Sequence, residues 1–129
     1  MVNIALAVSS DDPKVLGDTA AVYDHPLYFL SSSSHKGSLP MEQSYLKLDA
    51  RSTVLSAVVG SPRGDGLHVR LFETAGTEDS VTLGFAAPVT CSAAVDLRGR
   101  QVPSDITVKG REVTLTVKAN TIAEIAVTF

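Results

Sequence analysis

The sequence predicts an all-β fold, an antiparallel β-sandwich of about eight to ten short strands that forms a single domain over residues 1–129. Three observations support this prediction. Short runs of apolar and β-branched residues follow one another through most of the chain. Turn signals separate them at intervals of roughly 8–12 residues, which is typical of sandwiches and barrels. No segment has the 3.6-residue periodicity that predicts an amphipathic helix.

The first third of the chain is the least regular part. Residues 2–8 form an apolar run and are expected to be a strand covered on both faces. Residues 9–18 contain the acidic, proline and glycine residues of a loop, and residues 18–23 fit either a short helical turn or irregular structure. Residues 27–30 are expected to be a short strand, and residues 31–40 a polar loop.

From residue 44 onward the strand pattern is regular. Val113, Leu115 and Val117 alternate with threonines, the clearest example of a strand with one buried face. Asp-Gly or single-glycine turns close several of the hairpins. Eight strands are predicted here, over residues 44–48, 53–59, 67–73, 80–85, 92–97, 106–109, 112–118 and 122–129.

Composition excludes several classes of function. The net charge is −3 and no Lys/Arg cluster exists, so no nucleic-acid partner and no membrane-surface partner is expected. Cys91 is the single cysteine, so no internal disulfide forms, and it is expected to be a small buried residue. No run of 18 apolar residues exists and no basic n-region precedes the first apolar run. A cytoplasmic location is therefore expected.

A search for catalytic chemistry finds no complete site. His25, His35 and His68 have no zinc-ligand spacing, and no G-x-S-x-G nucleophile motif occurs. A glycosidase needs two carboxylates across a cleft, and spacing along strands cannot show which carboxylates face each other. Candidates by residue type alone are Asp65, Glu73, Asp96 and Glu124. The few aromatic residues, including Tyr23, Tyr28 and Phe29, are expected to serve core packing.

Arg70 and Glu73 are unusual charges on the strand predicted over residues 67–73. Strand alternation places them on opposite faces, which excludes a direct pair unless a bulge intervenes. Arg70 is therefore expected to pair with Glu124 or Asp96 from a neighbouring strand, and Glu73 fits an ion pair or a turn cap. The functional alternative is that His68, Arg70 and Phe72 together form an interface with another domain.

Several segments in the same order resemble the C-terminal β domain of glycoside hydrolase family 38, the zinc-dependent α-mannosidases. The segment DGLHVRLFETAG over residues 65–76 resembles the family's "dGlvvRlyEpsG". The segments AAVYDHPLYFL (20–30), HKGSLP…SPRGDG (35–66), AAVDLRGRQV (93–102) and NTIAEIAVTF (120–129) are similar to the family's other stretches. The chain departs from the family pattern at Val59, Phe72 and Ala123, where lysine, tyrosine and an aromatic residue are usual.

The resemblance implies a role by association. The family's zinc ligands and nucleophilic aspartate belong to a large N-terminal catalytic part, so no catalytic, cofactor-binding or metal-binding residue and no cofactor is expected in this chain. Zinc is implied only for the catalytic domain of the parent protein, a retaining α-mannosidase. The chain would be a C-terminal fragment that packs on that domain and helps to shape its cleft. The alternative is an independent sugar- or protein-binding module. Self-association of the isolated domain is expected if its separation leaves an apolar interface uncovered.

Overall fold

The computed structural model describes residues 4–25, 27–34, 36–61 and 64–129. The chain divides into two compact units, Met1–Gln43 and Ser44–Phe129. All the described strands lie in the second unit, so the sandwich occupies residues 44–129 and not the whole of 1–129.

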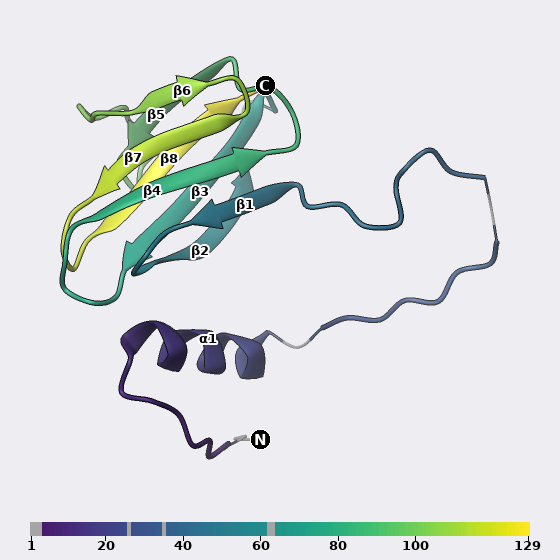
Figure 1. The fold of residues 1–129 in the computed structure, drawn as a ribbon. Coiled ribbons are helices and arrows are strands. Elements are labelled where there is room, and N and C mark those ends of the chain that lie inside the picture. The colour runs from purple at the N-terminus through teal and green to yellow at the C-terminus, as the bar shows by residue number, and fades with distance from the viewer. Residues whose placement is uncertain (1–3, 26, 35, 62–63) are drawn as a thin grey trace. The chain divides into compact units, whose positions relative to one another are not determined.

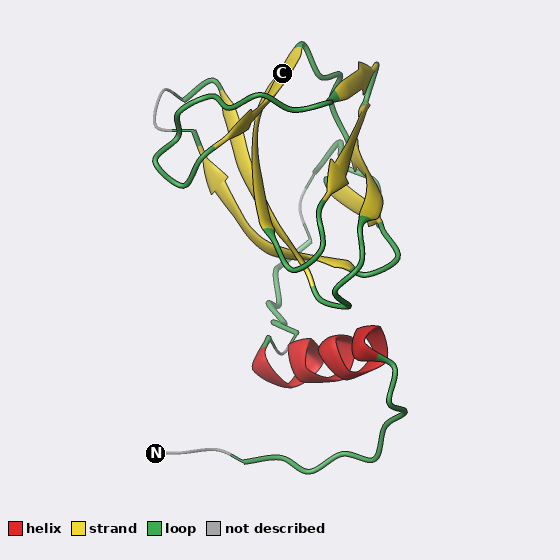
Figure 2. Cartoon of the chain, turned by 90° about the vertical axis from the view of Figure 1, so that its left-hand side faces the viewer, coloured by secondary structure: helices red, strands yellow, loops and turns green. Residues whose placement is uncertain are grey.

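The second unit is a β-sandwich of eight antiparallel strands, which confirms the predicted fold class (Figure 1). Figure 2 shows the strands separated into two layers. The first sheet has the order β1-β4-β7-β6 and the second has the order β2-β3-β8-β5. The strands are β1 Leu46–Asp49, β2 Thr53–Gly60, β3 Gly66–Glu73, β4 Asp79–Phe85, β5 Cys91–Val95, β6 Thr107–Lys109, β7 Glu112–Val117 and β8 Ile122–Thr128. Each of the eight strands predicted from residue 44 onward is found, with ends that differ by at most two residues.

The core lies between the two sheets and follows the predicted alternation. On β7, Val113, Leu115 and Val117 are buried, as are Val69 and Leu71 on β3. Because both sheets contribute one apolar row per strand, the inner faces together form a single apolar layer. The buried cluster consists of Val69, Leu71, Val81, Leu83, Phe85, Val89, Val113, Leu115, Val117, Ile125 and Val127.

The chain passes between the sheets five times, at the β1–β2, β3–β4, β4–β5, β5–β6 and β7–β8 connections. Only β2–β3 and β6–β7 are hairpins within one sheet. The β2–β3 hairpin ends at Gly66, where a Cβ atom would collide with the Val127 carbonyl oxygen, so glycine is required for β3 to pair with β8. Pro62 and Arg63 of this hairpin lie outside the described residues.

The first unit contains the helix α1, Pro13–Asp24, where the sequence predicted a loop over residues 9–18 and either a short helical turn or irregular structure over residues 18–23. The helix begins where Asp12 accepts a hydrogen bond from the Lys14 N–H at 2.8 Å, with Pro13 at the first helical position. Lys14 and Asp18 form an ion pair one turn apart. The helical alternative for residues 18–23 is therefore found, but the helix begins earlier, at Pro13, inside the predicted loop.

Two predictions for the first unit are wrong. Residues 4–8 and 27–30 were expected to be strands, yet the structure gives them no regular secondary structure. Leu27, Tyr28, Phe29 and Leu30 are each at least 90 % exposed, and Tyr23 on α1 is also exposed, so these aromatic rings do not pack in a core. A strand needs a partner for its backbone, and neither segment has one here. Residues 1–3 and His35 lie outside the described part of the chain.

No helix among the described residues is long and apolar enough to cross a lipid bilayer.

Candidate functional site

The outer face of the second sheet is the candidate site, because it carries His68, Arg70 and Phe72 of β3 together. Three rows of side chains cross this sheet in register. Phe72 lies between Val54 of β2 and Ile122 of β8. Arg70 lies between Ala57 and Glu124, and His68 between Val59 and Ala126. These nine residues form the outer face of the second sheet.

Glu124 holds the centre of the outer face. Its Oε2 atom accepts a hydrogen bond from Nε of Arg70 at 2.8 Å and forms an ion pair with the terminal guanidinium nitrogen Nη2, also at 2.8 Å. Its Oε1 atom lies 3.0 Å from Nδ1 of His68. Of the two carboxylates that the sequence offered Arg70, the structure selects Glu124, because β8 is hydrogen-bonded to β3. Both carboxylate oxygens of Glu124 are therefore engaged.

The pKa of Glu124 reflects two opposing effects. Burial raises it, but the hydrogen bonds and charges of His68 and Arg70 outweigh burial, so the pKa lies below its ordinary value. Glu124 therefore stays ionised at neutral pH and acts as an acceptor. A glycosidase general acid requires the opposite, a carboxyl group with a raised pKa.

The loop after β5 contains Asp96, the other carboxylate that was considered as a partner for Arg70. Its side chain accepts hydrogen bonds from the backbone N–H groups of Arg98 and Arg100 and pairs with the Arg100 guanidinium. The hydrogen bond from the Arg100 backbone is the largest cause that lowers the Asp96 pKa, and the other contacts with Arg100 and Arg98 lower it further. Gly99 at the tip has a positive φ of 75° and lies beside the His68 ring. Asp96 therefore shapes the loop next to the outer face and makes no ion pair with Arg70.

Glu73 lies on the opposite face of β3 from Arg70, as alternation predicts, and is almost completely buried. Its carboxylate accepts the backbone N–H groups of Ala75, Gly76 and Asn120, and the latter two are 2.9 Å away. The bond from Asn120 is the largest cause that lowers the Glu73 pKa from 4.5 to about 2. Glu73 therefore caps two turns at once, the β3–β4 turn and the β7–β8 turn.

Asp79 is a buried carboxylate that was not singled out from the sequence. It accepts hydrogen bonds from the backbone N–H groups of Arg51, Ser52 and Thr53 at 2.8–3.3 Å, in the β1–β2 connection. Burial raises its pKa, but these hydrogen bonds outweigh that effect and the pKa is lowered. The burial of Asp79 could have been predicted from the sequence, because its side chain falls on the same side of the strand as those of Val81 and Leu83, which face inward.

The nine residues of the outer face include His68 and Glu124 but no serine, threonine or cysteine. In the described part of the chain no serine, threonine or cysteine side chain hydrogen-bonds to His68, so no activated nucleophile is formed. Over the same residues, no group of three His, Cys, Asp or Glu side chains is placed to hold a metal ion. Cys91 was expected to be buried and is exposed, because it lies at the start of the edge strand β5.

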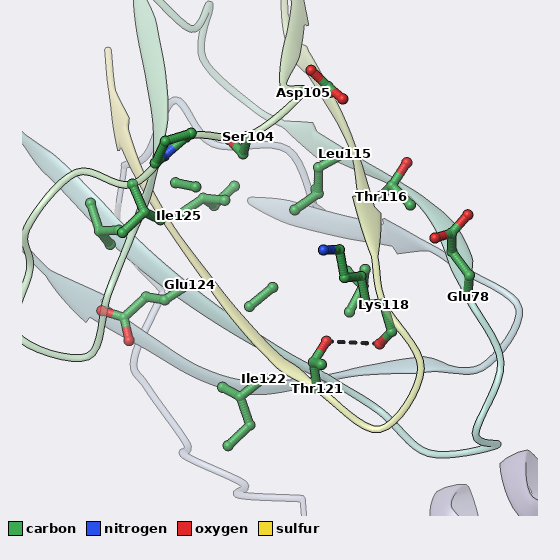
Figure 3. Close-up of a pocket in the computed structure, with 16 residues that line it drawn as sticks. Glu78, Ser104, Asp105, Leu115, Thr116, Lys118, Thr121, Ile122, Glu124 and Ile125 are labelled. Carbon is green, nitrogen blue, oxygen red and sulfur yellow. Dashed lines mark hydrogen bonds between the residues drawn. The ribbon is translucent and has the colours of Figure 1, made fainter.

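A separate cleft of about 650 Å³ opens between the sheets, beside β5, β7 and β8 (Figure 3). Its walls include Ala94, Leu115 and Ile125, and its lining contains no aromatic ring. The Lys118 side chain points into the cleft, whereas the Glu124 carboxylate points away from it. The Thr121 hydroxyl donates to the Lys118 carbonyl oxygen at 2.7 Å. The lining of the cleft also includes Ile122 and Glu124 of the outer face, so the two candidate sites adjoin along β8.

Comparisons with known proteins returned no match to any protein-family model, curated protein or solved structure.

The buried Glu73 predicts a specific acid dependence of stability. Its folded-state pKa of about 2 is below its ordinary value of 4.5, so its contribution is complete above pH 4.5 and is lost as the pH falls toward 2. Glu73→Gln should lower the urea midpoint at neutral pH, and its difference from wild type should shrink over that window. Exposed Glu78→Gln is the control and should leave the midpoint unchanged. Parallel pH curves for wild type and Glu73→Gln would contradict the turn-capping role.

The Arg70–Glu124 pair predicts a measurable coupling energy. A double-mutant cycle of Arg70→Met and Glu124→Gln, followed by urea unfolding, should give about 1 kcal/mol, since Arg70 is partly exposed and solvent screens the pair. The same cycle between Arg70 and Glu112, which lies on the first sheet, should be additive. Additivity at Arg70 and Glu124 would show that the ion pair contributes nothing to folding.

Proposed function

We propose that this chain is a non-catalytic β-sandwich domain of an α-mannosidase-like glycoside hydrolase in the cytoplasm. Its outer face packs on a zinc-dependent catalytic domain of the same parent protein and helps to shape that domain's cleft. The chain itself takes no part in the bond-breaking chemistry. The ordered series of segments that resembles family 38, from about Ala20 to the end of the chain, supports the assignment of the parent enzyme.

The single observation that carries the docking role is the contrast between the two solvent-facing sheet surfaces. The first sheet has polar side chains there, among them Lys47, Thr82 and Thr116. The outer face of the second sheet instead carries an apolar row of Val54, Phe72 and Ile122, of which Ile122 is 60 % exposed. A one-sided apolar surface beside ordered charges is the composition of a protein interface.

The first unit supplies independent support for a larger partner. Its apolar segments, residues 4–8 and 27–30, are among the most exposed parts of the described chain. Burying a side chain such as Leu or Phe stabilises a protein by about 1.5–3 kcal/mol, and these residues gain none of it here. A partner domain that pairs with these segments would give them the strand neighbours they lack.

The carboxylates support the absence of a catalytic role in this chain. Asp65 accepts the Ser61 hydroxyl at 2.8 Å, Glu73 caps two turns, and Asp96 and Glu124 are held by arginine. Every clearly shifted carboxyl pKa among the described residues is lowered. Glu73, Asp79, Asp96 and Glu124 are therefore held in their ionised form and serve the fold as hydrogen-bond acceptors.

The alternative is an independent binding module, and the cleft beside β7 and β8 is the observation that favours it. Its volume of about 650 Å³ is within the range of small-ligand sites. Sugar-binding sites usually present an aromatic ring for stacking, which this lining lacks, so the docking role accounts better for the molecule.

Activity and binding assays separate these functions. The isolated chain with added zinc should give no turnover of an aryl α-mannoside, and calorimetric titration with mannosides should give no heat of binding. Turnover would contradict the non-catalytic assignment. Saturable mannoside binding would favour the independent module.

Docking is tested with a separately expressed family 38 catalytic domain and interferometry. Phe72→Glu and Ile122→Glu should each weaken association with the chain at least about tenfold, because each places a charge within the apolar row. Thr116→Glu, on the polar face of the first sheet, is the matched control and should leave association unchanged. Equal effects at all three positions, or no association, would contradict the proposed interface.

A further inference from the structure

The four edge strands of the sandwich differ sharply in how they are protected. Natural edges are usually blunted by charge, short length or a covering segment, because an open edge pairs with other strands. The edge strand β1 has four residues and contains Lys47 and Asp49, and β6 has three residues and ends at Lys109. The edge strand β5 is covered, because Val95 bridges to Gln101 and the Val102 N–H donates to the Ala94 carbonyl oxygen.

The remaining edge, β2, has none of these protections. It is eight residues long, and its sequence TVLSAVVG contains no charged residue and no proline. Within the described part of the chain β2 pairs with β3 alone, and no turn or loop hydrogen-bonds to the backbone of residues 54–60. One side of this strand therefore presents a row of unpaired backbone donors and acceptors.

The side chains of β2 are also left partly uncovered on both faces. Leu55 and Val58 pair with Leu71 and Val69, which are fully buried, yet they remain 42 % and 44 % exposed. They continue the core row to the edge, where no further strand covers them. On the outer side, Val59 is 57 % exposed. An additional strand alongside β2 would cover these apolar side chains and satisfy the backbone at the same time.

We propose that β2 is a homodimerisation edge, at which the β2 strands of two copies of this chain pair antiparallel across a two-fold axis. The two four-stranded sheets then become one continuous eight-stranded sheet. The occupant is a second copy of this chain, and the contact is isologous.

Self-pairing fits β2 better than pairing with an unrelated charged strand. The two-fold axis keeps each side of the sheet continuous, so the inner row with Leu55 and Val58 lies beside the inner row of the other copy, and the outer row with Val59 beside the other outer row. No like charges oppose one another, because the strand has none. The register shift between Leu55 and Ala57 bends the strand, so pairing is centred on the regular stretch from Ala57 to Gly60.

This contact is separate from the docking role proposed above. Pairing at β2 joins backbones at the sheet edge, whereas docking is centred on Phe72 and Ile122 in the interior of the outer face, so Val54 and Val59 of β2 border both contacts. Both contacts can form on the same molecule, and either can fail without the other.

The test measures the mass of the full chain by light scattering over roughly 5 to 500 μM, because an edge contact this small is weak. Wild type should change from monomer to dimer. Hydrogen exchange should slow with concentration in residues 54–60 and not in β1 or β6. Val59→Lys and, separately, Val58→Lys should raise the dimer dissociation constant at least about tenfold, because the two-fold axis places the two introduced lysines at directly opposite or diagonal positions of the paired strands.

Ser80→Lys is the control, since Ser80 is exposed but lies on the interior strand β4 of the first sheet. It should leave the dissociation constant unchanged. A monomer throughout the concentration range would overturn the proposal. A dimer that survives both β2 substitutions, or whose slowed exchange lies outside residues 54–60, would overturn it as well.

Discussion

Two buried carboxylates, Glu73 and Asp79, hold three of the five connections through which the chain passes between the sheets. Asp79 accepts N–H groups from the β1–β2 connection, and Glu73 accepts them from the β3–β4 and β7–β8 connections. In each of these connections the chain leaves one sheet and enters the other. Backbone groups buried in such turns would destabilise the fold without partners, and each carboxylate supplies acceptors for three of them. The relative placement of the two sheets depends on this arrangement.

The strand register and the outer face follow from the way these carboxylates hold the turns. Because the turns are held in place, the apolar side chains of β3 and β4 face the same core. The alternate side chains of β3, those of His68, Arg70 and Phe72, therefore face outward. Register between β3 and β8 then brings Glu124 to Arg70 and His68. The outer face is thus a consequence of the strand order, and its apolar row is available for a partner domain while the edge at β2 is available for a second copy.

Sequence reasoning was most successful where local pattern decides the outcome. Alternation located the strands from β1 to β8 and placed Arg70 and Glu73 on opposite faces. The choice of Glu124 over Asp96 needed the strand order, which depends on contacts distant in sequence. Residues 27–30 have the composition of a strand, but composition cannot show whether a neighbouring strand exists. The start of α1 was missed because Asp12 and Pro13 serve equally well in a turn and at a helix start.

Amide exchange in Glu73→Ala, measured by NMR at neutral pH, tests most directly whether one carboxylate joins distant turns. The account predicts exchange at least about tenfold faster at Ala75, Gly76 and also Asn120, which is 47 residues away, since all three lose the same acceptor. The Gly110 turn of the β6–β7 hairpin, which Glu73 does not touch, should keep its rate. Faster exchange confined to Ala75 and Gly76, with Asn120 unchanged, would contradict the account.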